Sequence, residues 1–328
     1  MDRITEPPPE IRAELLELRT ALDRAVPAKL LDRNLIVATW NIRSLAEVTE
    51  KWSSDPEDVP PRDLHSLACI AEILAHFDVI ALQEIKGSGR GLRLILDRLG
   101  ANWGLLLSDP SPGRLGNLER LAFLYDRRKV IPDGLVCELV IAQERLVGEP
   151  RDGMTRQFAR TPYLASFRSL DKNFTLVNLH TIWGKGPEER GPELKEFAHW
   201  IANWALSSAA WDTNLIAVGD FNIESRDSPL YEAFTSTGLQ SPDDLMAAPR
   251  LIFQRPDDPV KLYDQIAWFD GEGEVPALEF NYCSGGSFDF RPHVLRERGL
   301  DLRKLAFMIS DHFPLWAEFS VREKRGRR

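Results

Sequence analysis

The sequence predicts an α/β fold, a four-layer α/β/β/α sandwich of two packed mixed β-sheets flanked by helices. Short apolar runs of strand length, rich in β-branched residues, recur along the chain and are hydrophobic on both faces. Helical patterns separate some of these runs. A single open sheet holding all of the runs would be very wide, so two packed sheets in one domain fit better.

The chain of 328 residues has the composition of an ordinary folded protein, with 43% hydrophobic and 28% charged residues. Its length allows one large domain or two ordinary domains. Because no linker or repeat divides the apolar runs, we predict one large domain at 34–322. It is preceded by a helical extension at 1–33 and followed by a basic tail at 323–328.

The first predicted element is a helix at 9–26, entered through three prolines at 7–9. Its apolar residues repeat at spacings of three and four, which puts them on one face. They are Ile11, Leu15, Leu18, Leu22 and Val26. We expect this face to dock on the domain and to carry no chemistry.

Strands follow, and helices separate some of them. Apolar residues at helical spacing predict helices around 64–74 and 194–201. Runs of strand length predict strands at 35–40, 78–83, 121–125, 163–167, 174–179, 215–219, 262–268 and 315–321. Four of these runs lead directly into a polar residue, and these residues are Asn41, Glu84, His180 and Asp220.

Long segments without such patterns are predicted as loops at 47–62, 144–156, 183–192 and 270–301. Loops of this length in a compact domain are usually functional or disordered. A basic cluster begins in the last of them, and the simplest interpretation is a solvated helix face. It contains Arg291, His293, Arg296, Arg298, Arg303 and Lys304.

The net charge of −9 argues against a surface that binds nucleic acid through bulk positive potential. Any contact with DNA would have to be local, and a cation bound among carboxylates would favour it. Cys69, Cys137 and Cys283 are far apart, so we interpret them as small buried side chains rather than metal ligands or disulfides.

Export and membrane signals are missing from the sequence. No apolar run approaches the roughly 18 residues that a membrane span needs, and the N-terminus does not resemble a signal peptide. We therefore expect a cytoplasmic protein without a membrane span, and nothing in the sequence indicates a stable protein partner.

The polar residues that follow buried strands are expected to meet, because neighbouring strands end at a common edge of the sheet. They combine carboxylate, amide and imidazole groups. Phosphoester hydrolysis needs this mixture: hard oxygen ligands for Mg²⁺ or Mn²⁺, amides for phosphate oxygens, and imidazoles that move protons near neutral pH. Paired cysteines and an HExxH motif are missing, which makes zinc less attractive.

Eight motifs, in order over most of the chain, resemble those of the endonuclease/exonuclease/phosphatase superfamily and, within it, the deoxyribonuclease I branch. Each motif is weak alone, but eight in order are specific. They are TWNIR at 39–43, IALQE at 80–84, ER at 119–120, RTPY at 160–163, NLH at 178–180, GDFN at 219–222, YDQI at 263–266 and ISDHFP at 309–314.

The resemblance implies a metal site for Mg²⁺ or Mn²⁺ at Glu84 and Asn41, with Asp311 as a third candidate ligand. One carboxylate and one amide are a plausible ligand set, because Mg²⁺ keeps several waters. The resemblance also implies two catalytic imidazoles, His180 and His312. One would take a proton from the attacking water, and the other would donate toward the leaving oxygen.

Each imidazole is expected to have an orienting carboxylate: by resemblance, Glu119 for His180 and Asp264 for His312. Asp220 lies two residues before Asn222 on a glycine-entered turn, so both side chains can face one point while the residue between them turns inward. Either Asp220 or His312 can be the general base.

Substrate contacts are also implied by the resemblance. Asn222 would donate to a non-bridging phosphate oxygen. Arg160 matches the family arginine that contacts substrate phosphate, and its guanidinium suits that role. Arg43 matches a deoxyribonuclease-like arginine that reaches a phosphate or a groove. Arg43 and Tyr125 could equally be ordinary surface or core residues.

The sequence thus predicts a metal-dependent phosphodiesterase, first of all a deoxyribonuclease I-like endonuclease acting on DNA. The alternative is a phosphatase or phospholipase of the same superfamily acting on inositol phosphates, sphingophospholipids or nucleotides. The turn continues with Ile223, Glu224 and Ser225, without the arginine usual in inositol polyphosphate phosphatases. A non-catalytic scaffold is disfavoured because the complete catalytic set is present.

Overall fold

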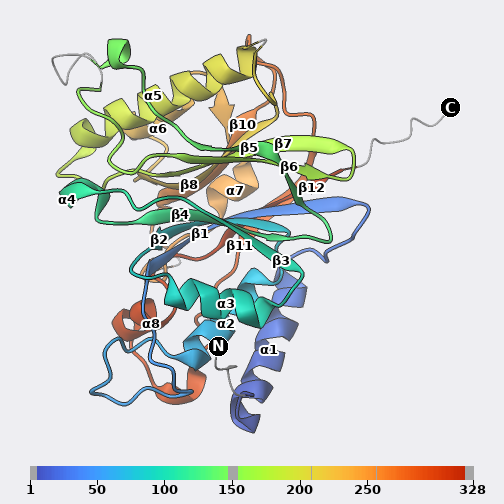
Figure 1. The fold of residues 1–328 in the computed structure, drawn as a ribbon, viewed down its shortest axis with the longest axis vertical. Coiled ribbons are helices and arrows are strands. Elements are labelled where there is room, and N and C mark those ends of the chain that lie inside the picture. Colours follow the sequence, from blue (N-terminus) through green and yellow to red (C-terminus); the bar gives the residue numbers. More distant parts are fainter. Residues whose placement is uncertain (1–5, 147–153, 208, 256, 322–328) are drawn as a thin grey trace.

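Two six-stranded β-sheets pack face to face, and helices cover their outer faces (Figure 1). The computed structural model describes residues 6–146, 154–207, 209–255 and 257–321. From one side of the molecule to the other, the layers are helices, first sheet, second sheet and helices. The predicted four-layer α/β/β/α fold is confirmed. The predicted basic tail at 323–328 lies outside the described residues.

The first sheet has the strand order β11-β12-β1-β2-β4-β3. The pair β1 and β2 is parallel, and the other neighbouring pairs are antiparallel. The strands are β1 (Asn34–Leu45), β2 (Val79–Ile85), β3 (Trp103–Leu107), β4 (Arg120–Asp126), β11 (Asn281–Ser287) and β12 (Leu315–Ser320).

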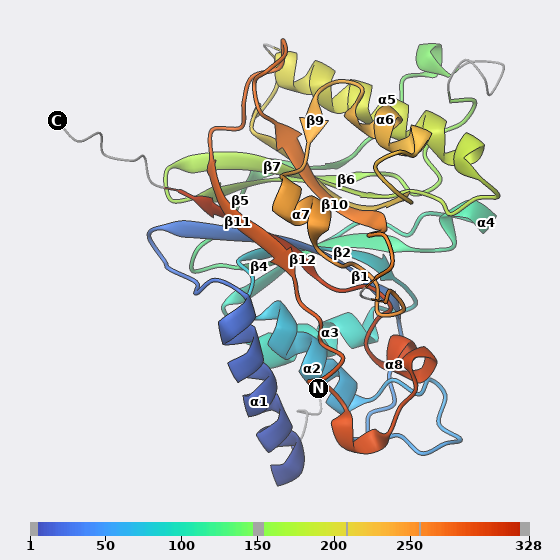
Figure 2. The same cartoon turned by 180° about the vertical axis from the view of Figure 1, so that it is seen from behind.

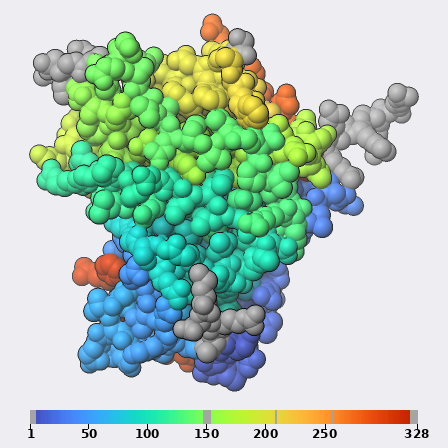
Figure 3. Space-filling model, viewed as in Figure 1, coloured from blue at the N-terminus to red at the C-terminus, as the bar shows by residue number. Residues whose placement is uncertain are grey.

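The second sheet has the order β5-β6-β7-β8-β10-β9, and its parallel pair is β7 and β8. Its strands are β5 (Ile131–Glu138), β6 (Tyr163–Ser169), β7 (Lys172–His180), β8 (Leu215–Ile223), β9 (Leu239–Gln240) and β10 (Leu262–Phe269). On the face shown in Figure 3, atoms coloured teal to green, from the part of the chain that includes β3, β4 and β5, cover the middle of the molecule.

Helices α1, α2 and α3 lie outside the first sheet, and α5 and α6 lie outside the second (Figures 1 and 2). The short helix α7 packs against β11 and β12. The helices are α1 (Pro9–Ala25), α2 (Leu64–Leu74), α3 (Arg90–Leu99), α4 (Gly113–Gly116), α5 (Pro187–Leu206), α6 (Pro229–Thr235), α7 (Asp243–Ala247) and α8 (Leu302–Met308). Two 3₁₀ turns are η1 (Gln143–Arg145) and η2 (Arg296–Arg298).

The strands are hydrophobic on both faces because each sheet is buried on both sides. In β1, Leu35 and Val37 face the second sheet, whereas Ile36 and Ala38 face the helices. This alternation follows from the two-residue period of a strand. Tyr125 of β4 also lies in the layer between the sheets, so it is a core residue.

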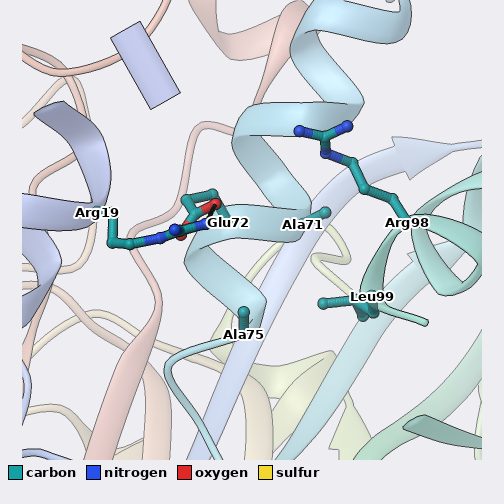
Figure 4. Close-up of a pocket in the computed structure, with 6 residues that line it drawn as sticks. All are labelled: Arg19, Ala71, Glu72, Ala75, Arg98 and Leu99. Carbon is teal, nitrogen blue, oxygen red and sulfur yellow. Dashed lines mark hydrogen bonds and ion pairs between the residues drawn. The ribbon is translucent and has the colours of Figure 1, made fainter. Parts of the chain in front are cut away.

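The N-terminal helix docks through its predicted apolar face, since Leu18 and Leu22 are fully buried in the same core as α2. Beside this contact, a hollow of about 340 Å³ is lined by residues of α1, α2 and α3 (Figure 4). Arg19 donates to both oxygens of Glu72 there, at 2.7 and 2.9 Å. The hollow adjoins Ala75, just before β2 begins, and so lies at the end of β2 opposite to Glu84.

Two predicted loops contain regular structure. Helix α5 begins at Pro187, inside the predicted loop 183–192, and β11 lies inside the predicted loop 270–301. The loop at 47–62 is irregular apart from an isolated bridge at Thr49. The loop at 144–156 lies partly outside the described residues.

The interpretation of the basic cluster as one solvated helix face is wrong for three of its residues. Arg291 lies outside regular structure, Arg296 and Arg298 lie in the short 3₁₀ turn η2, and the three form ion pairs with Asp289, Glu17 and Asp63. A local repeat of basic residues in sequence does not specify these partners, two of which come from the N-terminal part of the chain. Arg303 and Lys304 are exposed on α8, as expected.

Candidate active site

The parallel strand pairs of the two sheets end next to each other. β1 brings Asn41 and β2 brings Glu84, while β7 and β8 bring His180 and Asp220. The Asn41 amide joins the two sheets, because its Nδ2 donates to Glu84 Oε1 and to Asp220 Oδ2, each at 3.0 Å. The predicted convergence of these polar strand ends is therefore observed.

The backbone leaves regular strand geometry where these side chains are presented. Ser44, Glu84 and Asn222 have positive φ angles of 48°, 62° and 52°, a conformation that side chains other than Asn and Asp rarely adopt. A Cβ on Gly219 would lie 1.9 Å from the Leu179 carbonyl oxygen, so glycine is required there. Strained residues of this kind concentrate at functional sites.

Two buried imidazoles are directed toward Asp220, and each is bonded to a different carboxylate on its other nitrogen. His312 Nδ1 lies 2.7 Å from Asp264 Oδ2, and His180 Nδ1 lies 3.0 Å from Glu119 Oε2. The Nε2 atoms of His180 and His312 lie 3.7 and 3.9 Å from Asp220 Oδ2. Each imidazole is thus oriented by one carboxylate and directed toward another.

These contacts shift the pKa values in opposite directions. Burial lowers the pKa of His312, but the charge and hydrogen bond of Asp264, together with the charges of Asp220 and Asp311, outweigh it and raise the pKa to about 10. Burial raises the pKa of Asp220, but the charges of His312 and His180 and the hydrogen bonds from Asn41 and the Asn222 N–H outweigh it, so the pKa lies below its usual value. At neutral pH this arrangement keeps Asp220 ionised and His312 protonated.

Glu119 connects an imidazole with two basic side chains. Besides His180, its carboxylate lies 2.5 Å from Arg160 Nε and 3.3 Å from Lys86 Nζ. Arg160 Nη1 also donates to the Thr181 carbonyl oxygen at 3.1 Å. The guanidinium is therefore held in place while it lines the cleft beside His180.

Asp311 points toward Arg43 rather than joining the Glu84 carboxylate. Its Oδ2 accepts a hydrogen bond from Arg43 Nη1, and the Arg43 guanidinium lies 4.3 Å from the centre of the Phe307 ring. Glu84 Oε2 instead accepts from the backbone N–H of Ser44 at 2.9 Å.

The segment that ends at His312 is fixed to β1 by two hydrogen bonds, and a third bond lies within the segment. Ser310 Oγ donates to the Asn41 carbonyl oxygen at 2.6 Å and accepts from the His312 N–H at 3.0 Å. Trp40 Nε1 donates to the His312 carbonyl oxygen at 2.8 Å. These bonds explain how a residue near the C-terminus is held against the first strand.

Asn222 and Asp220 project into the cleft, while Phe221 between them turns into the core, as predicted. Asn222 Nδ2 donates to the Thr181 carbonyl oxygen at 3.0 Å, and its backbone N–H donates to Asp220 Oδ1 at 3.1 Å. The Phe221 ring packs against Phe234 and an α5 aromatic ring, with centroid distances of 4.7 and 5.5 Å.

The Endonuclease/Exonuclease/phosphatase family profile matches residues 38–312, which include all of these side chains. The chain belongs to this family. Members of the family are hydrolases that act on phosphate esters and phosphodiesters. No curated protein matches the sequence.

Solved structures of the endonuclease/exonuclease/phosphatase family share the fold at low sequence identity. A family member from Bacteroides vulgatus is 15% identical with a TM-score of 0.55, and the match covers 88% of this chain and 99% of that one. The mannosyl-6-phosphatase of Bacteroides thetaiotaomicron is 16% identical with a TM-score of 0.53, covering 87% and 99%. TDP2 from D. rerio, in complex with a single-strand DNA product, is 14% identical with a TM-score of 0.53, covering 87% and 98%.

The site residues of this family member line a cleft of about 400 Å³. Its lining contains most of the residues predicted from sequence, together with residues to which the sequence analysis gave no role. The lining residues are Asn41, Glu84, Arg160, His180, Trp183, Asp220, Asn222, Leu251, Phe253, Tyr263, Asp311 and His312. The sequence analysis missed Trp183, Leu251 and Phe253. The one signal available in the sequence was that Trp183 opens a long predicted loop at 183–192, of a length that is usually functional or disordered.

The oxygen donors at Glu84 fit a divalent cation. Burial raises the pKa of Glu84, but the charge of His180 and the hydrogen bond from Asn41 help to hold the pKa below its usual value. Among the described residues, no basic side chain lies within ion-pair distance of this carboxylate. An ionised carboxylate beside a carboxamide suits Mg²⁺, which takes few protein ligands.

A second cluster has metal-binding residue types but is occupied by hydrogen bonds. Among residues 6–146, 154–207, 209–255 and 257–321, only Glu14, His65 and Cys69 form a group of three potential ligands within 4.8 Å of one another. Arg298 Nη2 lies 3.2 Å from His65 Nδ1, so Nδ1 is the acceptor and Nε2 carries the proton that Glu14 accepts. This buried cluster therefore joins α1 to α2 rather than binding a metal.

None of the helices in the described part of the chain is long and apolar enough to cross a membrane. Of the cysteines, Cys69 is buried as predicted, whereas Cys283 is exposed.

Proposed function

We propose that this family member is a metal-dependent phosphodiesterase, a deoxyribonuclease I-like endonuclease that cleaves DNA by in-line attack of an activated water. The observation that supports this most is the pair of carboxylate-oriented imidazoles directed at Asp220, next to Arg160. Two imidazoles beside one carboxylate suit a reaction that activates water and protonates a leaving oxygen.

Glu84 and Asn41 would hold Mg²⁺ or Mn²⁺, with Asp311 nearby as a further oxygen donor. Such a cation neutralises charge on a phosphate oxygen. Asn41 also touches Asp220, so the proposed metal site and the water-orienting carboxylate are coupled through one amide.

Asp220 would orient the attacking water, because its pKa is lowered and it faces the cleft as an anion. His312 would carry a proton toward the phosphate through Nε2, while Asp264 fixes Nδ1. His180 faces the same carboxylate from the other side, with Glu119 as its orienting partner. The raised pKa of His312 favours it as a proton donor and leaves Asp220 as the group that polarises water.

Arg160 and Asn222 would bind the non-bridging oxygens of the scissile phosphate. Both line the cleft, and each is already fixed by a contact with the Thr181 carbonyl oxygen. Such preorganised donors stabilise the charge that develops in the transition state. Arg43 would contact a neighbouring phosphate once its pairing with Asp311 is exchanged for substrate.

Nicking of supercoiled plasmid tests this proposal. With Mg²⁺ or Mn²⁺ the protein should convert supercoiled plasmid to the open circular form, and EDTA should stop the conversion. A folded sample that cleaves neither plasmid nor bis-p-nitrophenyl phosphate with either metal would refute the phosphodiesterase assignment.

A phosphatase or phospholipase acting on a small phosphoester is the second candidate. The net charge of −9 favours it, since a small substrate needs no extended basic surface. Release of phosphate or headgroup from inositol phosphates, nucleotides or sphingomyelin, without plasmid nicking, would favour this candidate over the endonuclease.

A further inference from the structure

Three aromatic side chains line the cleft together with His312 and Asp220. We call these three, Trp183, Phe253 and Tyr263, the aromatic wall. Trp183 is 57% exposed and Phe253 is 47% exposed. Large exposed aromatic side chains at a binding cleft usually mark a surface that contacts ligand.

The wall is built against the catalytic groups. The rings of Trp183 and Tyr263 meet edge to face with centroids 5.5 Å apart, and the Tyr263 ring lies 6.3 Å from the His312 ring. The Arg190 guanidinium lies 5.1 Å from the centre of the Trp183 ring and is itself fixed by donation to the Asn222 carbonyl oxygen at 2.8 Å. Trp183 is thus held in place, with much of its surface still open.

Phe253 is connected to the catalytic segment through the backbone. Leu251 forms a bridge with His312, and the Ile252 N–H donates to the Asp311 carbonyl oxygen at 3.0 Å. Phe253 therefore follows directly after the residues that are bonded to Asp311 and His312, so a ligand bound in the cleft can contact both the aromatic wall and the catalytic groups.

Four basic side chains in or next to the cleft are already paired with carboxylates. Arg43 pairs with Asp311, Arg190 pairs with Glu224, and both Lys86 and Arg160 pair with Glu119. Together with the net charge of −9, this pairing leaves little positive potential to hold the two phosphate backbones of a duplex. Contacts with the parts of the substrate other than the scissile phosphate then have to be of another kind than ion pairs.

We propose that the aromatic wall stacks the base of an unpaired nucleotide next to the scissile phosphate, so that the substrate is single-stranded or locally unpaired DNA. The inference rests on the proposed nuclease function and specifies its substrate. A regular duplex keeps its base faces stacked inside and presents only base edges, whereas an unpaired base offers a face to an aromatic ring. Inositol phosphates and sugar phosphates offer no aromatic face.

The test uses short single strands with one cleavable phosphodiester, the other linkages being methylphosphonates. The base on either side of that phosphodiester is present, or is replaced by a tetrahydrofuran unit that keeps the backbone. With Mg²⁺, wild-type kcat/KM should be about 5- to 100-fold higher when the base on the stacked side is present, which is the range for stacking one base on an aromatic ring.

Trp183→Ala should abolish this preference, so that kcat/KM for the base-containing strand falls to the value for the abasic strand. Trp183→Phe keeps a ring and should retain most of the preference. Trp211→Ala is the matched control, because Trp211 is also exposed, at 61%, and is not part of the cleft lining. It should behave as wild type on both strands.

The outcomes separate the inference from the function on which it rests. Equal wild-type cleavage of base-containing and abasic strands, or faster cleavage of a regular duplex, would overturn the aromatic-wall inference and leave the nuclease function standing. An equal loss on both strands in Trp183→Ala would also overturn it. No cleavage of any strand or duplex would overturn both.

Discussion

Asp264 is fully buried, and its Oδ2 atom lies 2.7 Å from His312 Nδ1. This carboxylate fixes the tautomer and the direction of the imidazole, and its charge is the main reason that the ring keeps its proton. At the scale of single residues, the reactivity of His312 therefore depends on a neighbour that does not itself line the cleft.

Asp264→Asn tests this dependence. The amide keeps the size of the side chain but removes the charge, so the pKa of His312 should fall and the ring should lose its fixed orientation. We expect kcat to fall about 100- to 10,000-fold, the range for removing effective acid–base catalysis. Thermal unfolding by circular dichroism should confirm the fold, and Asp270→Asn, at an exposed position, should keep wild-type kcat. A wild-type kcat in Asp264→Asn would mean that the contact between Asp264 and His312 has no part in the mechanism.

Glu84→Gln tests the proposed metal site. Loss of the carboxylate charge should raise the Mg²⁺ concentration needed for half-maximal activity by about 10- to 100-fold, by analogy with the effect of altering residues around a metal. The neighbouring exposed Glu47 accepts hydrogen bonds from Ser88, so Glu47→Gln is the matched control. Overlapping Mg²⁺ titrations for wild type and Glu84→Gln would contradict the assignment.

The polar strand ends could be predicted from sequence because each follows a buried strand, and parallel strands finish at one edge. Trp183 and Phe253 could not, because their place in the cleft depends on the path of irregular chain. The same is true of Asp311: its position in the motif is clear, but its pairing with Arg43 depends on the irregularity within β1 between Asn41 and Leu45.

At the scale of elements, α1 is packed as part of the core. Leu18 is fully buried, whereas Leu16 on the same helix is 60% exposed. Leu18→Ala should lower the free energy of unfolding in urea by about 2–5 kcal/mol, through lost burial and the cavity left behind. Leu16→Ala should change it by less than about 0.5 kcal/mol. Equal effects of the two substitutions would mean that α1 is not part of the cooperative unit.

The end of β4 carries a carboxylate that should govern stability in acid. Asp126 is buried and accepts from Lys29 Nζ at 2.8 Å and from Arg128 Nε at 2.8 Å. Burial raises the pKa of Asp126, but these partners outweigh it and hold the pKa well below its usual value. The unfolded carboxyl titrates near about 3.9, so its stabilising contribution is complete above that pH and is lost as the pH falls toward the folded pKa.

Asp126→Asn should therefore lower the free energy of unfolding by roughly 2 kcal/mol at pH 7 and by less at pH 3, because it breaks a largely buried ion pair that protonation would also break. Urea unfolding between pH 3 and pH 7 measures this difference. Asp55→Asn removes an exposed partner of Lys51 and should leave the free energy of unfolding unchanged across this pH range. If the free energies of unfolding of wild type and Asp126→Asn differed by the same amount at every pH, protonation of Asp126 would not be the cause of the loss of stability in acid.

The strands missed from sequence share one property: β3, β5, β9 and β11 are the four edge strands of the two sheets. An edge strand is buried less and tolerates glycine, proline and polar residues, which also protect it from pairing with other chains. β5 contains a proline and a glycine, and β11 contains two glycines. Apolar runs identify interior strands because only those strands must be hydrophobic on both faces.

At the scale of the whole molecule, the relative position of the two sheets determines the site, because the metal candidate Glu84 and the carboxylate Asp220 come from different sheets. Buried polar contacts fix this position close to the strand ends. Gln83 Nε2 donates to Thr39 Oγ1 at 3.0 Å within the first sheet and to Asn178 Oδ1 of the second sheet at 2.8 Å. Apolar packing alone would permit small shifts, whereas buried hydrogen bonds specify one register.

The charge of the whole molecule leads to a prediction about salt. Each phosphate neutralised by a basic side chain adds about −0.7 to −0.9 to the slope of log affinity against log salt. With Arg160 and Arg43 as the proposed phosphate contacts, the slope should be only about −1 to −2, far from the value near −6 of a protein with a basic binding surface. The slope is measured as kcat/KM for a single strand between 50 and 200 mM KCl at fixed free Mg²⁺, in the regime where kcat/KM follows affinity.

Arg160→Gln should make this slope about one unit shallower. Arg33→Gln, on an exposed arginine outside the cleft lining, should leave it unchanged. A steep slope would mean that several further basic side chains contact the DNA phosphates. That behaviour is expected for duplex binding and not for a single base held by the aromatic wall. The salt dependence therefore tests, independently of any substitution in that wall, whether this acidic protein recognises DNA mainly through one phosphate and one base.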